Sequence, residues 1–289
     1  MIYTLKNKQL EIKIAHPLHG YKSSRFDWTG KIFEIFFDGI QITTIENPSA
    51  TESLQLGAGL YNEFLDYEHV EIEKWFHKIG VGLIKKSRCP TDYSMKYEIK
   101  PANFNVIPTN NRLIIKCKSD VLDGYAYVLY KEIILKENTF TVEYLLENTG
   151  EKKIKIDEYI HNFLAINHDP ISPSYSLTFP FQIRREGSKE TVNPSNVFTF
   201  NDNEIHFNKQ TEHQFFMDHI NGKQCVNAQW ELLHSIEKIG IRETASFQSN
   251  KINLWGWKHV ISPELYYHIQ IEPKEFATWS RCYEFFRID

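Results

Sequence analysis

The feature that most constrains the fold is a hydrophobic pattern of period two. In residues 139–146 (TFTVEYLL) every second side chain from Phe140 onwards is apolar, whereas Thr141 and Glu143 point the other way. The same alternation, rich in β-branched and aromatic residues, recurs in residues 112–118, 125–134, 265–272 and 276–286. An aromatic fraction of 14% also favours sheets, because aromatic side chains fit pleated, half-buried surfaces.

Turn residues separate these extended segments. Asp38-Gly39 and Asp123-Gly124 suit the tight turns of β-hairpins. Helical periodicity is scarce: residues 51–66 and 210–220 could each hold a turn or two of helix. The region from about residue 167 to 212 is polar and irregular, and reads as a long excursion within one domain.

No linker or change of composition divides the 289 residues, so we expect a single domain over residues 1–289. Many strands in one domain of this length predict an all-β protein, a large antiparallel sandwich with few short helices.

The charge argues against a nucleic-acid partner, because the net charge is −4 and no sustained basic run occurs. No stretch reaches the ~18–20 apolar residues of a membrane span, and the first residues lack a secretory signal pattern. The four cysteines are widely scattered without a CxxC pair. Reduced thiols in a cytoplasmic protein are the simplest interpretation, and no cofactor motif is present.

His161 is the first candidate for chemistry. If the strand that contains it is regular, Asp157, Tyr159 and His161 share its polar face. A histidine beside an acid and a phenol can titrate near neutrality and act as a proton donor. The alternative is a histidine that is only hydrogen-bonded at a sheet surface.

The C-terminal segment offers a second polar face, formed by Glu264, Tyr266, His268, Gln270 and Glu272. Two carboxylates, an imidazole, an amide and a phenol suit a ligand with many hydroxyl groups. From spacing alone, a solvent-facing strand explains the pattern equally well.

Near the N-terminus, Arg25, Asp27 and Trp28 lie close together in the sequence. They could form a surface ion pair, or an arginine fork could bind sugar hydroxyls beside an indole that stacks on the ring. His16 and His19 could share a helical face, but the proline and glycine around them oppose a helix. We therefore predict no metal site.

Four segments together resemble the aldose 1-epimerase (galactose mutarotase) family. They are YKEIILKENTFTVEYLLENTGEKKIKIDEYIHNFLAIN, the closing HIQIEPKEFATWSRCYEFF, SSRFDWTGKI and FHKIGVGLI. The similarity runs in order through nearly the whole chain. It implies a β-supersandwich with an open cleft and a monosaccharide substrate.

In this family, a carboxylate removes the proton of the anomeric hydroxyl while an imidazolium protonates the ring oxygen. The ring opens, the carbonyl rotates, and closure gives the other anomer, with no metal or nucleotide. The resemblance assigns His161 as the acid and Glu264 as the base, with Glu272 as the alternative base.

For substrate binding, the resemblance points to Arg25, with Asp27 and Trp28 beside it, and we add Glu63 and His268 as candidates. The family carries another histidine in a turn that should fall near residues 57–64. Here that region reads GAGLYNEF and has none, so substrate positioning should differ.

Two rival functions stay open. One is a sugar-binding or sensing module without turnover, which becomes preferable if His161 and Glu264 cannot flank one pyranose ring. The other is an epimerase of phosphorylated hexoses, which requires a cluster of basic residues. The candidates for that cluster are Lys78, Arg184, Arg185 and Arg281.

Overall fold

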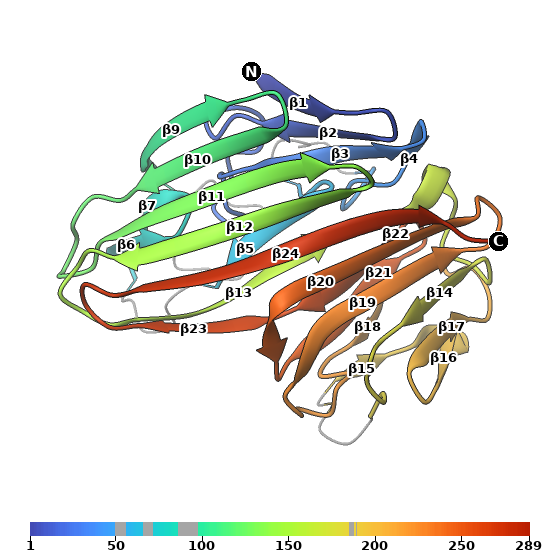
Figure 1. Ribbon diagram of the computed structural model, residues 1–289. Coiled ribbons are helices and arrows are strands. Elements are labelled where there is room, and N and C mark those ends of the chain that lie inside the picture. The colour runs from blue at the N-terminus through green and yellow to red at the C-terminus, as the bar shows by residue number, and fades with distance from the viewer. Residues whose placement is uncertain (50–55, 66–71, 86–97, 185–187, 189) are drawn as a thin grey trace.

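Two large antiparallel sheets face each other across the main hydrophobic core (Figure 1). The computed structural model describes residues 1–49, 56–65, 72–85, 98–184, 188 and 190–289. Within these residues the first sheet has seven strands. Their order is β1 (Ile2–Lys6), β2 (Leu10–Ala15), β3 (Lys31–Phe37), β5 (Leu60–Phe64), β13 (Ile154–Asn162) and β23 (Tyr267–Ile271), with β4 (Ile40–Gln41) beside β3.

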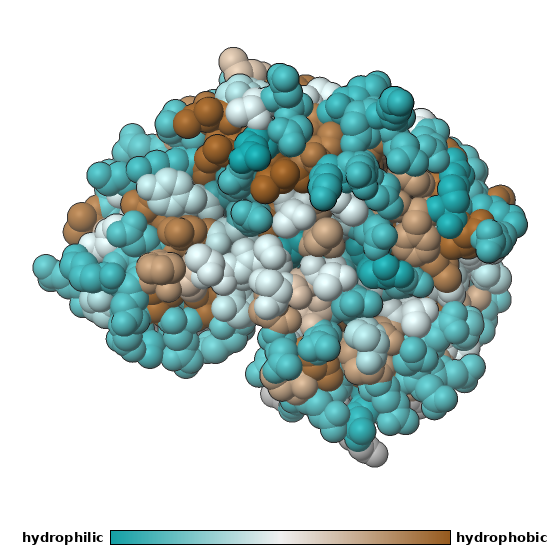
Figure 2. All heavy atoms as spheres, viewed as in Figure 1, coloured by the Kyte–Doolittle hydropathy of each residue, from teal (hydrophilic) through white to brown (hydrophobic). Residues whose placement is uncertain are grey.

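The second sheet has ten strands among the described residues. Their order is β16 (Phe198–Asn201), β17 (Glu204–Phe207), β14 (Tyr175–Thr178), β19 (Val226–His234), β20 (Ile239–Ser249), β24 (Phe276–Arg287), β12 (Thr139–Asn148), β11 (Tyr127–Lys136), β10 (Arg112–Lys118) and β9 (Asn103–Pro108). Its exposed face is mostly covered by hydrophilic residues and residues of intermediate hydropathy, with hydrophobic residues in separate patches (Figure 2).

Two smaller sheets complete the described structure. One contains β15 (Thr191–Val192), β18 (Phe215–Met217), β21 (Ile252–Trp257) and β22 (Val260–Leu265). The other contains β6 (Trp75–Lys78), β7 (Gly82–Lys85) and β8 (Ile99–Pro101). Helical structure in the part described is limited to the 3₁₀ turns η2 (Ile166–His168) and η3 (Pro194–Asn196).

These sheets confirm the predicted all-β class and its antiparallel sandwich. On β12, every second side chain from Phe140 to Leu146 is buried in the core, as the period-two pattern requires. Asp38 and Gly39 have φ angles of 48° and 81°, so the predicted hairpin turn between β3 and β4 is left-handed at both positions. None of the described helices is long and apolar enough to cross a membrane.

Three sequence predictions about local structure are wrong. The helical turns expected in residues 51–66 and 210–220 are replaced by β5 and β18, although residues 50–55 and 66–71 lie outside the described part. The region 167–212 contains the short strands β14 to β17, which are too brief to show periodicity. Residues 265–272 do not form one strand, because the chain passes from β22 to β23 at Tyr266.

Gly59 allows β5 to approach β3 closely, and its replacement by alanine should be strongly destabilising. Its φ angle is +59°, and an added Cβ would collide with the backbone of Ile32 and Phe33. We expect Gly59→Ala to lower the free energy of unfolding by about 3 kcal/mol, combining left-handed strain with overpacking. Gly39→Ala is the matched control, because Gly39 has φ +81° and open space around it.

Urea denaturation would measure both variants. The free energy of unfolding of the control should fall by only about 1–2 kcal/mol, which is the cost of the left-handed backbone conformation. Equal losses for the two variants would show that the close approach at Gly59 costs nothing.

Candidate active site

The candidate site forms on one face of β13, where it pairs with β5. In this register His161 lies opposite Tyr61, and Tyr159 lies opposite Glu63. All four side chains are buried. Alternation along β13 puts Tyr159 and His161 on the same face, as the sequence predicted. This face of β13 is buried around His161. The alternative interpretation, a histidine that is only hydrogen-bonded at a sheet surface, is therefore wrong.

A strand of another sheet brings the carboxylate to this histidine. Beyond the end of β13, Leu164 exchanges backbone hydrogen bonds with Ile261 on β22, at 3.1 and 3.0 Å. The Asn162 side chain donates a hydrogen bond of 2.6 Å to the carbonyl of Pro263. These contacts fix β22 against β13 and place Glu264 beside His161.

The two predicted catalytic side chains touch each other. His161 Nε2 lies 3.2 Å from Glu264 Oε1, and both side chains are buried. For an epimerase, we expected the two groups to flank one pyranose ring. The structure corrects this expectation, because a contact of this length leaves no space for a sugar ring between the two groups.

The surroundings shift both groups away from their usual ionisation. Burial raises the pKa of Glu264 to about 8, outweighing the hydrogen bond from Tyr266 and the nearby Arg25 charge. Burial also lowers the pKa of His161 well below its usual value, and the positive charge of Arg25 adds to this effect. At neutral pH the pair therefore holds one proton, mainly on the carboxyl group.

Aromatic rings surround His161 and Glu264, and they make the surroundings of the pair apolar. The His161 ring stacks on Phe163, with ring centroids 4.8 Å apart, and meets the edge of Trp255 at 5.6 Å. Tyr266 stacks on Tyr159 at 4.4 Å, and its hydroxyl donates a hydrogen bond of 3.1 Å to Glu264 Oε2. Desolvation by these rings favours the uncharged forms of both titrating groups.

Two predicted binding residues join the site in a second polar cluster. Tyr159 donates a hydrogen bond of 2.6 Å to Glu63 Oε2, and Arg25 Nε lies 3.3 Å from the same oxygen. Arg25 Nη1 also pairs with Glu46 Oε1 at 2.6 Å. Sequence reasoning missed Glu46, which lies in an irregular segment without a pattern. The Glu63 side chain is buried, and its Oε1 lies 4.0 Å from Lys78 Nζ.

Two other predicted binding residues do not reach this site, and the structure corrects both predictions. Asp27 is buried between the sheets, where its carboxylate accepts a hydrogen bond of 2.6 Å from Lys131. Trp28 is also buried, and its indole donates to the Ser23 carbonyl and stacks near Phe104. Both side chains therefore bond to other parts of the protein rather than to the pair of His161 and Glu264.

The last two predicted residues lie farther along the strands, on an exposed surface. His268 Nδ1 contacts the Asp157 carboxylate at 2.7 Å. Glu272 forms an ion pair with Lys153 at 2.8 Å, and its side chain is 55% exposed. The alternative assignment of Glu272 as the base is therefore wrong, because it cannot share a buried proton with His161.

The basic residues proposed for a phosphate site lie in different settings. Lys78 is buried beside Glu63, whereas Arg281 is buried between Glu158 and Glu243 in the core. Arg184 lies next to Asn221 at an isolated bridge, and Arg185 lies outside the described residues. The described members therefore do not form the predicted cluster. Among the residues that the structure covers, no three His, Cys, Asp or Glu side chains are grouped to hold a metal ion.

Comparison with known proteins shows which of them share this fold. No protein-family model matches the sequence, and no similar sequence is found among curated proteins. Solved structures do match. An Escherichia coli protein provisionally named an aldose 1-epimerase is 12% identical, with a TM-score of 0.64 over 100% of this chain and 99% of that one.

Two further structures agree with this result. A galactose mutarotase-like protein from Lactobacillus casei is 11% identical, with a TM-score of 0.60 over 99% of this chain and 100% of that one. An aldose epimerase homologue from C. elegans is 10% identical, with a TM-score of 0.56 over 100% and 99%. The chain therefore has the fold of the aldose 1-epimerase and galactose mutarotase-like proteins, as its sequence resemblance predicted.

Proposed function

We propose that this protein is an aldose 1-epimerase-like isomerase that interconverts the α and β anomers of a free hexose. The observation that carries the proposal is the buried contact of 3.2 Å between His161 and Glu264, in which burial raises the pKa of Glu264 to about 8. Arg25 and Glu63 beside this pair supply charged groups that suit sugar hydroxyls.

The proposed reaction needs only proton transfers. Movement of the shared proton from Glu264 to His161 Nε2 gives a carboxylate and an imidazolium. The carboxylate then takes the proton of the anomeric hydroxyl as the imidazolium protonates the ring oxygen, and the bond between C1 and that oxygen breaks. Rotation of the aldehyde and reversal of these steps give the other anomer and restore the pair.

The direct contact between the pair is compatible with this chemistry. The anomeric hydroxyl oxygen and the ring oxygen are bonded to the same carbon atom. An acid and a base that lie side by side can therefore reach both oxygens from one edge of the sugar. The ring does not have to pass between His161 and Glu264.

Saturation-transfer NMR tests the proposal. Saturating the β-anomer proton of glucose, galactose or another aldose should reduce the α-anomer signal faster with the protein than in buffer alone. Exchange no faster than buffer, across the whole panel of aldoses, would contradict an enzyme of this kind.

A sugar-binding module without turnover is the second candidate. It is favoured because groups that lie 3.2 Å apart cannot flank a pyranose ring. The epimerase requires instead that the sugar meets both groups from one edge. Ligand-observed NMR separates the two candidates: an aldose that binds while its anomers exchange only at the buffer rate supports the module.

The pH dependence of anomer exchange should follow the shared proton. We expect kcat/KM to fall as the pH rises through about 8, because Glu264 then loses the proton of the pair. On the acid side, activity should persist through the ordinary histidine range and fall only at lower pH, because burial lowers the pKa of His161 well below its usual value. Rates measured from pH 5 to 9.5, corrected for buffer catalysis, would check this. A protein-dependent rate that keeps rising above pH 8 would contradict it.

A further inference from the structure

Ser262 connects the two groups of the candidate pair, although nothing in its sequence context indicates a role. It lies on β22, and its side chain is fully buried. Its Oγ lies 3.1 Å from His161 Nδ1 and 3.3 Å from Glu264 Oε1. The same oxygen accepts a hydrogen bond of 3.0 Å from the backbone N–H of Asn162. One hydroxyl therefore touches both candidate catalytic side chains and the strand that carries the histidine.

The proton count at this hydroxyl allows two arrangements. Ser262 has a single hydroxyl proton, which can go to Glu264 Oε1 or to His161 Nδ1. In the first arrangement, Nδ1 must carry a proton and donate it to Oγ, so Nε2 of the neutral ring presents a lone pair to Glu264. In the second arrangement, Nε2 carries the ring proton and points it at a carboxylate. The serine thus couples the tautomer of His161 to the protonation of Glu264.

We propose that Ser262 is a positioning residue that holds His161 in the Nδ1–H tautomer by accepting that proton while donating its own to Glu264. In this arrangement Oγ accepts from Asn162 and His161 and donates to Glu264, which uses its full capacity. The lone pair of Nε2 then faces Glu264 Oε1 at 3.2 Å, so the proton between them belongs to the carboxyl group. Burial, which raises the pKa of Glu264 to about 8, is consistent with that placement.

The consequence for turnover rests on the proposed epimerase function. Only an Nε2 that is free of its own proton can receive the proton of Glu264 and become the imidazolium that protonates the ring oxygen. In the other tautomer, Nε2 already carries a proton, so the proton transfer from Glu264 cannot begin. Loss of the group that fixes a catalytic ring tautomer commonly costs at least about tenfold in activity.

The first experiment reads the tautomer directly and needs no activity. Long-range ¹H–¹⁵N correlation spectra of the ¹⁵N-histidine-labelled protein at neutral pH should show His161 protonated at Nδ1. In Ser262→Ala, the Nδ1–H form should lose its dominance. A wild-type ring protonated at Nε2, or an unchanged tautomer in the variant, would overturn the proposal.

The second experiment uses the pH profile of anomer exchange. The hydrogen bond from Ser262 lowers the pKa of Glu264, so Ser262→Ala should move the alkaline fall in kcat/KM to higher pH. It should also reduce kcat/KM by at least about tenfold. Ser262→Thr keeps a hydroxyl and should restore both the tautomer and the profile. If kcat/KM of Ser262→Ala falls at the same alkaline pH as in the wild type, the positioning role of Ser262 is contradicted.

Ser249→Ala provides the matched structural control. Ser249 is also buried, but its hydroxyl bonds only to backbone groups, namely the carbonyls of Lys251 and Tyr266 and the N–H of Lys251. Its loss should lower stability without changing the His161 tautomer. If wild type shows the Nδ1–H tautomer but no anomer exchange, the proposed function fails and the tautomer assignment stands. If Ser249→Ala changes the tautomer as much as Ser262→Ala, the assignment to Ser262 fails.

Discussion

Glu264→Gln is expected to lower kcat/KM for anomer exchange by about 10²–10⁴-fold, the usual contribution of a positioned acid or base. Glutamine matches the size of the side chain and can still accept the hydrogen bond from Tyr266, but it cannot hold or release the shared proton. His161→Asn should cause a loss of the same order. Saturation-transfer NMR at pH 7 would measure both.

The double variant, which combines Glu264→Gln with His161→Asn, gives a sharper test. Because the two groups pass one proton between them, removing the second should add little to the loss caused by the first. Glu272→Gln is the control, since that carboxylate only forms an exposed ion pair with Lys153. Retention of wild-type exchange in Glu264→Gln, or a comparable loss in the control, would contradict the assignment of the base.

The sequence could predict the strands because their burial is local and repeats every two residues. It could also indicate His161 and Glu264, through polar faces and the family resemblance. The contact between them could not be predicted. The alternation of polar and apolar residues continues unbroken through Tyr266. It therefore gives no sign of the point where the chain passes from β22 to β23 and changes sheets. That change brings Glu264, but not Glu272, to the histidine.

The role of Asp27 was hidden for a different reason. Its partner Lys131 lies 104 residues later on β11, and no local pattern connects the two. A signal was nevertheless present in the strands. Lys131 occupies an inward position on β11, between the buried Leu129 and Ile133. A charged residue at an apolar position of a strand indicates a buried ion pair, because an unpaired charge is too costly there.

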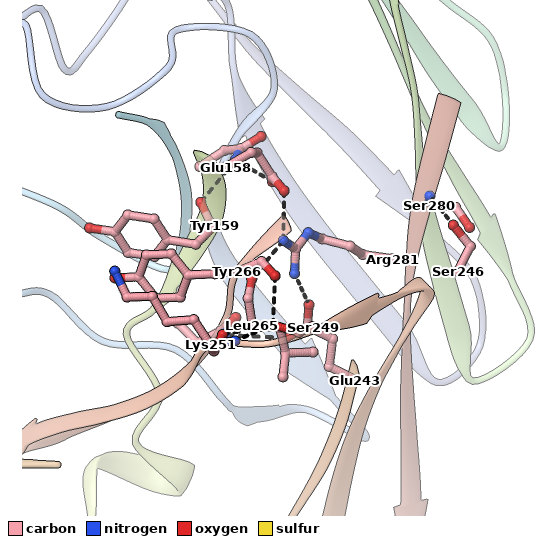
Figure 3. Close-up of polar contacts among 12 residues, drawn as sticks. Glu158, Tyr159, Glu243, Ser246, Ser249, Lys251, Leu265, Tyr266, Ser280 and Arg281 are labelled. Atoms are coloured by element: carbon pink, nitrogen blue, oxygen red, sulfur yellow. Dashed lines mark hydrogen bonds and ion pairs between the residues drawn. The ribbon is translucent and has the colours of Figure 1, made fainter. Parts of the chain in front are cut away.

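The same signal marks Arg281, which shares the inward face of β24 with Trp279 and Tyr283. Its guanidinium lies between two fully buried carboxylates, 2.7 Å from Glu158 and 2.6 Å from Glu243 (Figure 3). It also donates a hydrogen bond of 2.9 Å to the Leu265 carbonyl. The network therefore joins β24 to the strands that carry both Tyr159 and Glu264.

Arg281→Met should lower the free energy of unfolding by about 3–5 kcal/mol at pH 7, because it leaves two carboxylates buried without their cation. The loss should shrink at pH 5. An unpaired buried carboxylate has a pKa above its unfolded value, so the folded variant binds protons more tightly and gains stability as the pH falls. Urea denaturation at both pH values would measure the effect.

Arg242→Met is the control for this prediction, because Arg242 also pairs with two glutamates, Glu231 and Glu284. Those contacts are as short, at 2.6 and 2.7 Å, but the side chains are 24–39% exposed. Water can solvate the carboxylates left behind, so the control should lose no more than about 1 kcal/mol. Similar losses in the two variants would mean that burial does not set the strength of the Arg281 network.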